Sequence, residues 1–300
     1  MWYCGWDGGG TKTEVLILSE GGEVLADQSF GPLNPNGASR EKVKESIREA
    51  VAFMQGQPGG EEACGGLVIG VAGLSNQDVV RLMAEGLQEA GLQGKYRLAG
   101  DQEIALAGAI DGHGAILIAG TGAICHGRTP TGEAFRVGGY GYLIDDGGSG
   151  YAIGRDILAA VARAFDGRGQ KTILSGMMQA ALKFDEKSLQ PMITWLYAPE
   201  TGKKEIASLS RLLPEALATG DVVAMGIAEK AAEDLVELVL TGWRKTGMKD
   251  GELALTGSIL TKIPEIRQRV EAKIEQVYPE IQVMRPRRSP AMGAALMAMG

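Results

Sequence analysis

The segment Trp6-Asp7-Gly8-Gly9-Gly10-Thr11-Lys12-Thr13 decides the fold of this 300-residue chain. Its three successive glycines remove every Cβ from the turn, so backbone N–H groups can converge on an anion. Thr11 and Thr13 add hydroxyl donors. The segment therefore predicts a loop that binds phosphate.

Two charged side chains of this loop have separate expected roles. Asp7 would repel a phosphate directly, but it could hold Mg²⁺ through water, as oxygen ligands do at nucleotides. Lys12 either contacts a phosphate or extends into solvent. The segment matches neither the Walker A nor the Rossmann pattern, and a strand follows it where both require a helix. The sequence thus indicates a different nucleotide-binding fold.

Hydrophobic periodicity predicts the remaining elements. In the first part of the chain we expect strands at 15–18, 24–26, 67–72 and 95–99, and helices at about 41–54 and 77–90. In the second part we expect strands at 115–119, 134–137, 252–255 and 281–284, and helices at about 153–166, 171–184, 204–218, 221–246, 264–277 and 290–299. Both halves indicate an α/β fold with a mixed sheet.

The beginning of the chain recurs near residue 111. Gly10-Thr11 precedes Gly22-Glu23 by twelve positions, and Gly120-Thr121 precedes Gly132-Glu133 by the same twelve. Chance in a glycine-rich chain is the alternative explanation. The repeat predicts two similar domains, residues 1–111 and 112–300, with their glycine turns facing an interdomain cleft.

Composition and charge limit the classes of function that this chain can have. The chain is 45% hydrophobic and 22% charged, which suits a globular protein. Its net charge of -7 argues against a nucleic-acid partner. No apolar run could span a bilayer and no signal peptide is evident, so we expect a cytoplasmic protein without a membrane partner. Three scattered cysteines fit small buried residues better than a disulfide framework or a zinc site, and two histidines argue against a histidine-based metal site.

These motifs resemble the actin-like superfamily of sugar kinases, Hsp70 and actin, in which a D-x-G-x-[TS]-[KR] hairpin forms the first phosphate loop and G-T-G the second. Within it the chain resembles the N-acetylglucosamine kinase group, also called the BadF/BadG/BcrA/BcrD ATPase family. The matching segments lie in order along nearly the whole chain: Asp7 to Thr13, Gly31 to Asn36, Gly100-Asp101, Gly120-Thr121-Gly122, Gly138 to Gly141 and Asp146 to Tyr151.

The resemblance implies two actin-like, ribonuclease H-like domains with mixed sheets. It also implies an ATP- and Mg²⁺-dependent kinase whose small-molecule substrate is N-acetylglucosamine, glucosamine or N-acetylmuramic acid. A homodimer is the commonest assembly for such an enzyme.

A kinase needs a carboxylate to take the proton of the attacking hydroxyl. Asp101 follows the expected strand 95–99 and opens an apolar helix, where an N-cap role alone would explain it. The resemblance implies that Asp101 is the general base. Asn34 and Asn36 lie in a Pro/Gly-rich loop that plain turn chemistry would explain, and the resemblance implies that one of them binds sugar hydroxyls.

Further substrate contacts are implied by the resemblance. Tyr140 stands between glycines and could offer a flat face to a sugar ring, although the family usually has Trp there. The family sequence G-D-E-G-S is Asp145-Asp146-Gly147-Gly148-Ser149 here, which leaves the sugar specificity open. The implied contacts are Thr121, Gly122, Tyr140, Asp146, Ser149 and Gly150.

The nucleotide side involves a second strand end. Thr256-Gly257-Ser258 closes an expected strand and precedes a helix. A plain strand-turn-helix would explain this segment, whereas the resemblance implies that it contacts adenosine. The last helix, from Ser289-Pro290, carries small residues suited to close packing and could pack back on the first domain.

Two other functions stay open. An ATPase that activates an acyl-CoA dehydratase or reductase shares this family name, but it needs cysteines for an iron–sulfur cluster, and Cys125 stands alone in the second domain. A sugar-binding protein without catalysis is the other alternative.

Overall fold

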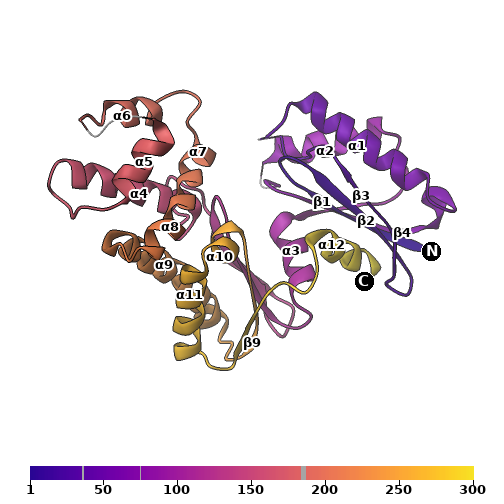
Figure 1. Ribbon diagram of the computed structural model, residues 1–300. Helices are drawn as coiled ribbons and strands as arrows, with labels where there is room; N and C mark the ends of the chain where they lie inside the picture. The colour runs from indigo at the N-terminus through magenta and orange to yellow at the C-terminus, as the bar shows by residue number, and fades with distance from the viewer. Residues whose placement is uncertain (36, 75, 184–186) are drawn as a thin grey trace. The chain divides into compact units, whose positions relative to one another are not determined.

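The computed structural model describes residues 1–35, 37–74, 76–183 and 187–300. The chain divides into two compact units, the first comprising residues 1–111 and 286–300 and the second comprising residues 112–285 (Figure 1). The C-terminal segment thus belongs to the same unit as the N-terminus.

The first unit is built on a five-stranded mixed sheet in the order β3-β2-β1-β4-β5. Its strands are β1 (Trp2–Gly8), β2 (Thr13–Ser19), β3 (Val24–Phe30), β4 (Cys64–Val71) and β5 (Arg97–Gly100). β1 and β2 form an antiparallel hairpin, whereas β4 and β5 run parallel to β1. Gly8 pairs with Val71, and Val71 pairs with Gly100, so the carboxyl ends of three strands share one edge.

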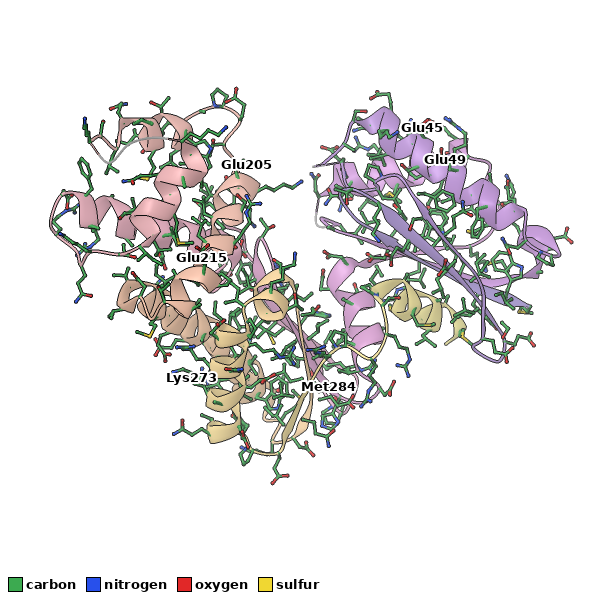
Figure 2. The ribbon with its side chains drawn as sticks, viewed as in Figure 1. Glu45, Glu49, Glu205, Glu215, Lys273 and Met284 are labelled. Carbon is green, nitrogen blue, oxygen red and sulfur yellow. The ribbon has the colours of Figure 1, made fainter. Side chains whose placement is uncertain are left out.

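Two helices cover one face of this sheet, α1 (Arg40–Gln55) and α2 (Gln77–Glu89), and a short 3-10 turn, η1 (Gly60–Ala63), precedes β4. Ile47 of α1 and Leu82 of α2 are buried in one core with Ile69 of β4. Glu45 and Glu49 are exposed on α1 and point away from the sheet (Figure 2). The amphipathic pattern that predicted both helices therefore matches their packing.

The other face is covered by α3 (Asp101–Ala109) and α12 (Pro290–Met299), which lie side by side (Figure 1). A Cβ at Gly5 of β1 would lie 2.1 Å from the backbone nitrogen of Ala295. A Cβ at Gly293 would lie 2.0 Å from the carbonyl oxygen of Ile104. Glycine thus lets α12 lie directly on β1 and α3, and the small residues of the last helix serve close packing, as predicted.

The second unit repeats this plan in the order β10-β9-β6-β7-β8. Its strands are β6 (Gly114–Ala119), β7 (Ala123–Arg128), β8 (Ala134–Gly138), β9 (Gly251–Thr256) and β10 (Ile281–Met284). The turn glycines Gly22 and Gly132 have φ values of 80° and 84°. Their amides donate to Ser19 and Thr129 at 3.0 and 2.9 Å. The predicted fold class, α/β with two similar mixed-sheet units, is confirmed.

The helices of the second unit pack on its sheet and on one another. They are α4 (Gly150–Phe165), α5 (Leu174–Leu182), α6 (Gln190–Leu196), α7 (Lys203–Ser208), the 3-10 turn η2 (Leu209–Leu212), α8 (Leu213–Ala218), α9 (Val222–Thr246), α10 (Ser258–Lys262) and α11 (Pro264–Val277). Leu117 of β6, Ile157 of α4 and Leu235 of α9 share one buried core.

Some expected elements differ from the structure. The sequence did not predict the bounds of β1, β7, α6 or α10. The single helix expected at 204–218 is instead three pieces, because Pro214 lies in the first turn of α8 and has no N–H to continue a helix. The helix expected at 171–184 is α5, and residue 184 lies outside the described residues.

Two expectations drawn from composition can be compared with the structure. Among the described helices, none is both long and apolar enough to cross a membrane. All three cysteines are free, and Cys4 and Cys125 are buried as predicted, whereas Cys64 is only half-buried.

Candidate active site

The first phosphate loop, residues 9–12, connects β1 to β2. The amide of Gly9 donates to the Lys12 carbonyl at 3.0 Å and closes the turn. A Cβ at Gly8 would lie 2.9 Å from Leu33 and from the Gly70 carbonyl, so Gly8 is a packing residue. A Cβ at Gly10 would meet no described atom within 4 Å. Gly10 and the exposed Thr11 therefore leave one side of the backbone open to a ligand.

The loop that carries Asn34 is fastened to this phosphate loop. The amides of Leu33 and Asn34 donate to the Gly9 carbonyl at 3.1 and 3.2 Å. The buried Thr13 hydroxyl donates to the Gly31 carbonyl at 2.7 Å, so it supports the turn and is directed away from the open side of the loop. Asn36, the other predicted sugar contact, lies outside the described residues.

Three carboxylates gather around this loop. Asp7 is the last residue but one of β1, and Glu14 pairs with it across the hairpin. Burial and the charges of Glu14 and Asp101 together raise the pKa of Asp7 to about 6, against the opposing effect of the Lys12 ammonium. Lys12 forms an exposed ion pair with Glu14, so a phosphate contact would require it to leave that partner.

This carboxylate group suits a magnesium ion that is shared with a nucleotide. A hard cation would relieve the mutual repulsion that raises the pKa of Asp7. The described residues contain no cluster of three or more protein ligands for a metal. Mg²⁺ at nucleotides keeps several waters and uses only one or two carboxylates with the phosphates, so Asp7 fits that role.

Asp101 is the first residue of α3, and it is exposed. Its Oδ1 accepts from the amide of Gln102 at 3.0 Å. The N-cap is Gly100, whose amide donates to Glu103 at 3.1 Å, so the predicted N-cap role of Asp101 is wrong by one position. The Asp101 carboxylate lies at the sheet edge where β1, β4 and β5 end.

The second phosphate loop, Gly120 to Gly122, connects β6 to β7 in the second unit. The amide of Gly120 donates to the Gly122 carbonyl at 2.9 Å, and the amide of Gly150 donates to the Gly120 carbonyl at 2.7 Å. Ser149 is buried and caps α4 by accepting from Ala152 at 3.2 Å. Ser149 and Gly150 thus bring the positive end of a 16-residue helix to this loop.

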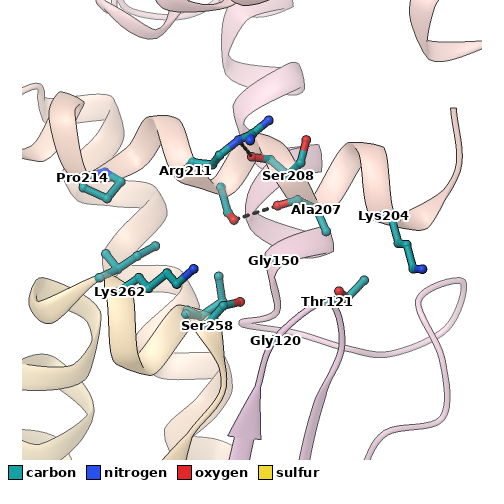
Figure 3. A pocket seen from close by; sticks show the side chains of 13 residues that line it. Gly120, Thr121, Gly150, Lys204, Ala207, Ser208, Arg211, Pro214, Ser258 and Lys262 are labelled. Carbon is teal, nitrogen blue, oxygen red and sulfur yellow. Dashed lines mark hydrogen bonds between the residues drawn. The ribbon is translucent and has the colours of Figure 1, made fainter. Parts of the chain in front are cut away.

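A cavity of about 450 Å³ begins at this loop (Figure 3). Basic side chains, Lys204, Arg211 and Lys262, line it together with apolar ones such as Ala207 and Ile259. The complete lining is Gly120, Thr121, Gly150, Lys204, Ala207, Ser208, Ser210, Arg211, Pro214, Ser258, Ile259, Lys262 and Ile263. An apolar slot with cationic groups beside a glycine loop is suited to a nucleotide.

The predicted adenosine segment contributes unequally to this cavity. Ser258 lines it. Gly257 has φ 92°, and a Cβ there would lie 2.3 Å from the Ala119 carbonyl, so this glycine lets β9 end close to β6. Thr256 pairs with Ile118 in the sheet and is not among the lining residues. The sequence interpretation missed Lys204, Ser208 and Arg211, although their i, i+4, i+7 spacing marks one helix face.

The acidic segment after β8 supports the second phosphate loop. Asp146 is 3% exposed and has φ 66°. Its Oδ1 accepts from the amide of Ala123 at 3.1 Å, and its Oδ2 accepts from Lys203 at 2.8 Å. Both carboxylate oxygens therefore already have protein partners, and a sugar contact of Asp146 stays a prediction.

Tyr140 is 66% exposed and follows β8. The Arg136 guanidinium lies 5.0 Å from its ring centroid, and Asp145 accepts from the Tyr140 amide at 3.1 Å. Asp145, which replaces a family glycine, therefore holds the loop of Tyr140. A Cβ at Gly147, which replaces a family glutamate, would lie 3.0 Å from Asp234.

Comparison with known proteins identifies the family. The model of the BadF/BadG/BcrA/BcrD ATPase family matches residues 4–298. The chain belongs to this family. The resemblance found in the glycine motifs is thereby confirmed for nearly the whole chain.

Relatives in the family are sugar kinases by name. The N-acetylmuramic acid/N-acetylglucosamine kinase of Clostridium acetobutylicum is 35% identical over 301 residues, which cover 99% of this chain and 98% of the relative. The N-acetyl-D-glucosamine kinase of Dictyostelium discoideum is 30% identical over 312 residues, which cover 99% and 97%. The crystal structure of a candidate N-acetylglucosamine kinase from Chromobacterium violaceum shares the fold with a TM-score of 0.77 at 24% identity, covering 99% of this chain and 98% of that one.

Proposed function

We propose that this protein is an ATP-dependent kinase that phosphorylates a hydroxyl of an amino sugar, namely N-acetylglucosamine, glucosamine or N-acetylmuramic acid. The observation that carries the proposal is the cavity of about 450 Å³ beside Gly120 and Thr121, with its three cationic side chains. Full-length similarity to two amino sugar kinases supports the substrate class.

In the proposed reaction the two glycine loops, Gly8 to Thr13 and Gly120 to Gly122, hold the phosphates of ATP. Asp101 accepts the proton of the sugar hydroxyl while the hydroxyl oxygen bonds to the γ-phosphorus. The bond from that phosphorus to the bridging oxygen of ADP breaks. Asp7 would hold Mg²⁺ through water, and the bound ion would neutralise charge on the phosphates. Asn34, Tyr140 and Asp146 are the proposed sugar contacts.

A redox activator with an iron–sulfur cluster is less compatible with the side chains. Cys125 is the only cysteine of the second unit and is buried in its core, where burial raises the pKa of its thiol to about 12. A cluster needs thiolates, which such a site disfavours. A colourless, iron-free purified protein would be the expected observation.

The decisive experiment compares wild type with Asp101→Asn. Each protein is incubated with Mg-ATP and a panel of amino sugars, and sugar phosphate is identified by phosphorus NMR while ADP release is followed. Loss of general-base assistance should slow turnover by roughly 10² to 10⁴ with little change in the KM for ATP.

Asp78→Asn is the matched control, because Asp78 also lies in the first turn of a helix of the first unit and its side chain is 71% exposed. This control should turn over like wild type. Full activity of Asp101→Asn would remove Asp101 from its role as base. Absence of sugar phosphate from wild type with every member of the panel would reject the kinase itself. Sugar binding without phosphorylation would then indicate a non-catalytic sugar-binding protein.

A further inference from the structure

A buried ion pair lies behind the second phosphate loop. Lys203 is the first residue of α7, and its Nζ lies 2.8 Å from Oδ2 of Asp146. The side chain of Lys203 is 30% exposed, whereas that of Asp146 is 3% exposed. The Lys203 ammonium also lies 5.5 Å from the ring centroid of Tyr142. Asp146 is therefore a desolvated carboxylate whose charge partner is the Lys203 ammonium.

The pair is pressed against the loop. A Cβ at Gly122 would lie 2.9 and 3.0 Å from the two carboxylate oxygens of Asp146, and 3.1 Å from Nζ of Lys203. Asp146 adopts φ 66°, a left-handed conformation that costs free energy for a non-glycine residue and persists only where its surroundings determine it. Its bond from the Ala123 amide is one such determinant, because Ala123 directly follows the loop.

Lys203 begins α7, the helix that forms part of the wall of the proposed nucleotide cavity. The residues that follow it in α7, Lys204, Ala207 and Ser208, line that cavity. In Figure 3 Lys204 and Ala207 lie on the helix beside Gly120, Thr121 and Gly150. A Cβ at Gly154 of α4 would lie 2.0 Å from the Ile206 carbonyl, so α7 lies directly on α4. The ion pair thus joins the wall of the cavity to its phosphate loop.

The charges of the Lys203–Asp146 ion pair bear on phosphate binding. A carboxylate within a few ångströms of a phosphate loop would repel the phosphates it holds, and burial strengthens that repulsion. The ammonium of Lys203 cancels the charge of Asp146 and fixes its geometry. Removing only the cation would leave a buried, uncompensated anion beside the loop.

We propose that Lys203 is a positioning residue for the nucleotide: through Asp146 it sets the second phosphate loop and neutralises the charge behind it. The proposal rests on the proposed function only in assigning a nucleotide to this loop. It does not depend on which sugar is the substrate.

The test measures Mg-ADP affinity by calorimetry without sugar, and the ATP KM and kcat with it. Lys203→Met should weaken Mg-ADP binding and raise the ATP KM by roughly 10- to 100-fold, as expected for an unpaired buried charge. Lys203→Arg, which keeps the charge, should lose less. The control is Lys230→Met, because Lys230 pairs with Asp156 at 2.6 Å on the exposed side of α4 and should leave binding unchanged.

A double variant separates electrostatics from packing. Lys203→Met combined with Asp146→Asn carries no buried charge, so it should recover most of the Mg-ADP affinity that the single variant loses. Unchanged binding by a folded Lys203→Met, or a double variant as impaired as the single one, would overturn the proposal. So would a wild type that does not bind Mg-ADP. Lys203-dependent Mg-ADP binding without any sugar phosphate would support this inference while rejecting the kinase.

Discussion

At the scale of single residues, Asp7 shows the conflict between folding and function most directly. Its carboxylate is partly buried near two other carboxylates, and these effects together raise its pKa to about 6. At neutral pH the folded protein must therefore hold an anion in an unfavourable place. A cation supplied with the nucleotide would remove that penalty.

The first prediction concerns the stability of Asp7→Asn. The folded pKa of about 6 lies above the unfolded value of 3.8, so between these pH values the folded state binds more protons. The contribution of Asp7 to the free energy of unfolding should thus fall as the pH rises from about 4 to about 6. At pH 8 and without Mg²⁺, Asp7→Asn should be more stable than wild type by about 1 to 2 kcal/mol, a value discounted for partial exposure.

Urea unfolding at pH 4 and pH 8 tests this prediction, with Asp78→Asn as the exposed control. The gain should appear at pH 8 and disappear at pH 4, and kinase activity should be lost although the fold is more stable. Equal stability of wild type and Asp7→Asn at pH 8 would show that burial and the neighbouring charges do not destabilise the Asp7 carboxylate.

At the scale of elements, Gly8 at the end of β1 and Gly10 in the first phosphate loop have different roles. Gly8 fills a packed position against Leu33 and Gly70, whereas no described atom would lie within 4 Å of a Cβ at Gly10. We expect Gly8→Ala to destabilise the fold by about 1 to 3 kcal/mol through overpacking. We expect Gly10→Ala to leave stability unchanged but to raise the KM for ATP, because its methyl group would occupy the open side of the loop.

Thermal unfolding of the two variants measures the change in stability, and ATP kinetics measure the change in the KM for ATP. Each variant controls for the other, since both add one methyl group to the same turn. An ATP KM of Gly10→Ala equal to that of wild type would mean that phosphate does not approach the open side of this loop.

The elements that periodicity predicted are those with one clear apolar face. α1, α2 and α9 bury regular stripes, so their pattern was visible in the sequence. β1 was missed because Gly5 interrupts its apolar run, although Trp2, Cys4 and Trp6 alternate and are buried. The turn signals at Gly22 and Gly132 worked because only positive φ satisfies those turns.

The sequence could propose site residues only where backbone chemistry decides them. The glycine loops stood out because a phosphate site demands bare N–H groups, and their role in phosphate binding stays a prediction. Lys203 could not, because its partner Asp146 is 57 residues away and only the fold brings them together. Arg211 and Lys262 likewise meet at one cavity from separate helices.

At the scale of the whole molecule, the first unit depends on both ends of the chain. Asp111 accepts from Arg288 at 2.6 Å and pairs with Arg287 at 3.2 Å, and the amides of these arginines bond to the end of α3. α12 then covers the sheet face that α1 and α2 leave open. The first unit therefore cannot complete its fold until the last helix is present.

The final prediction tests that dependence through Gly5. Because a Cβ there would lie 2.1 Å from the backbone of Ala295, Gly5→Ala should push α12 from β1 and destabilise the first unit by about 3 kcal/mol. Calorimetric unfolding should show the loss as a lower unfolding temperature of the first unit, to which both β1 and α12 belong. Gly21→Ala, with an ordinary 3.6 Å contact, should change stability by less than about 0.5 kcal/mol. Unaltered unfolding of Gly5→Ala would mean that the terminal helix is not seated on β1 in solution, and that the first unit completes its fold without it.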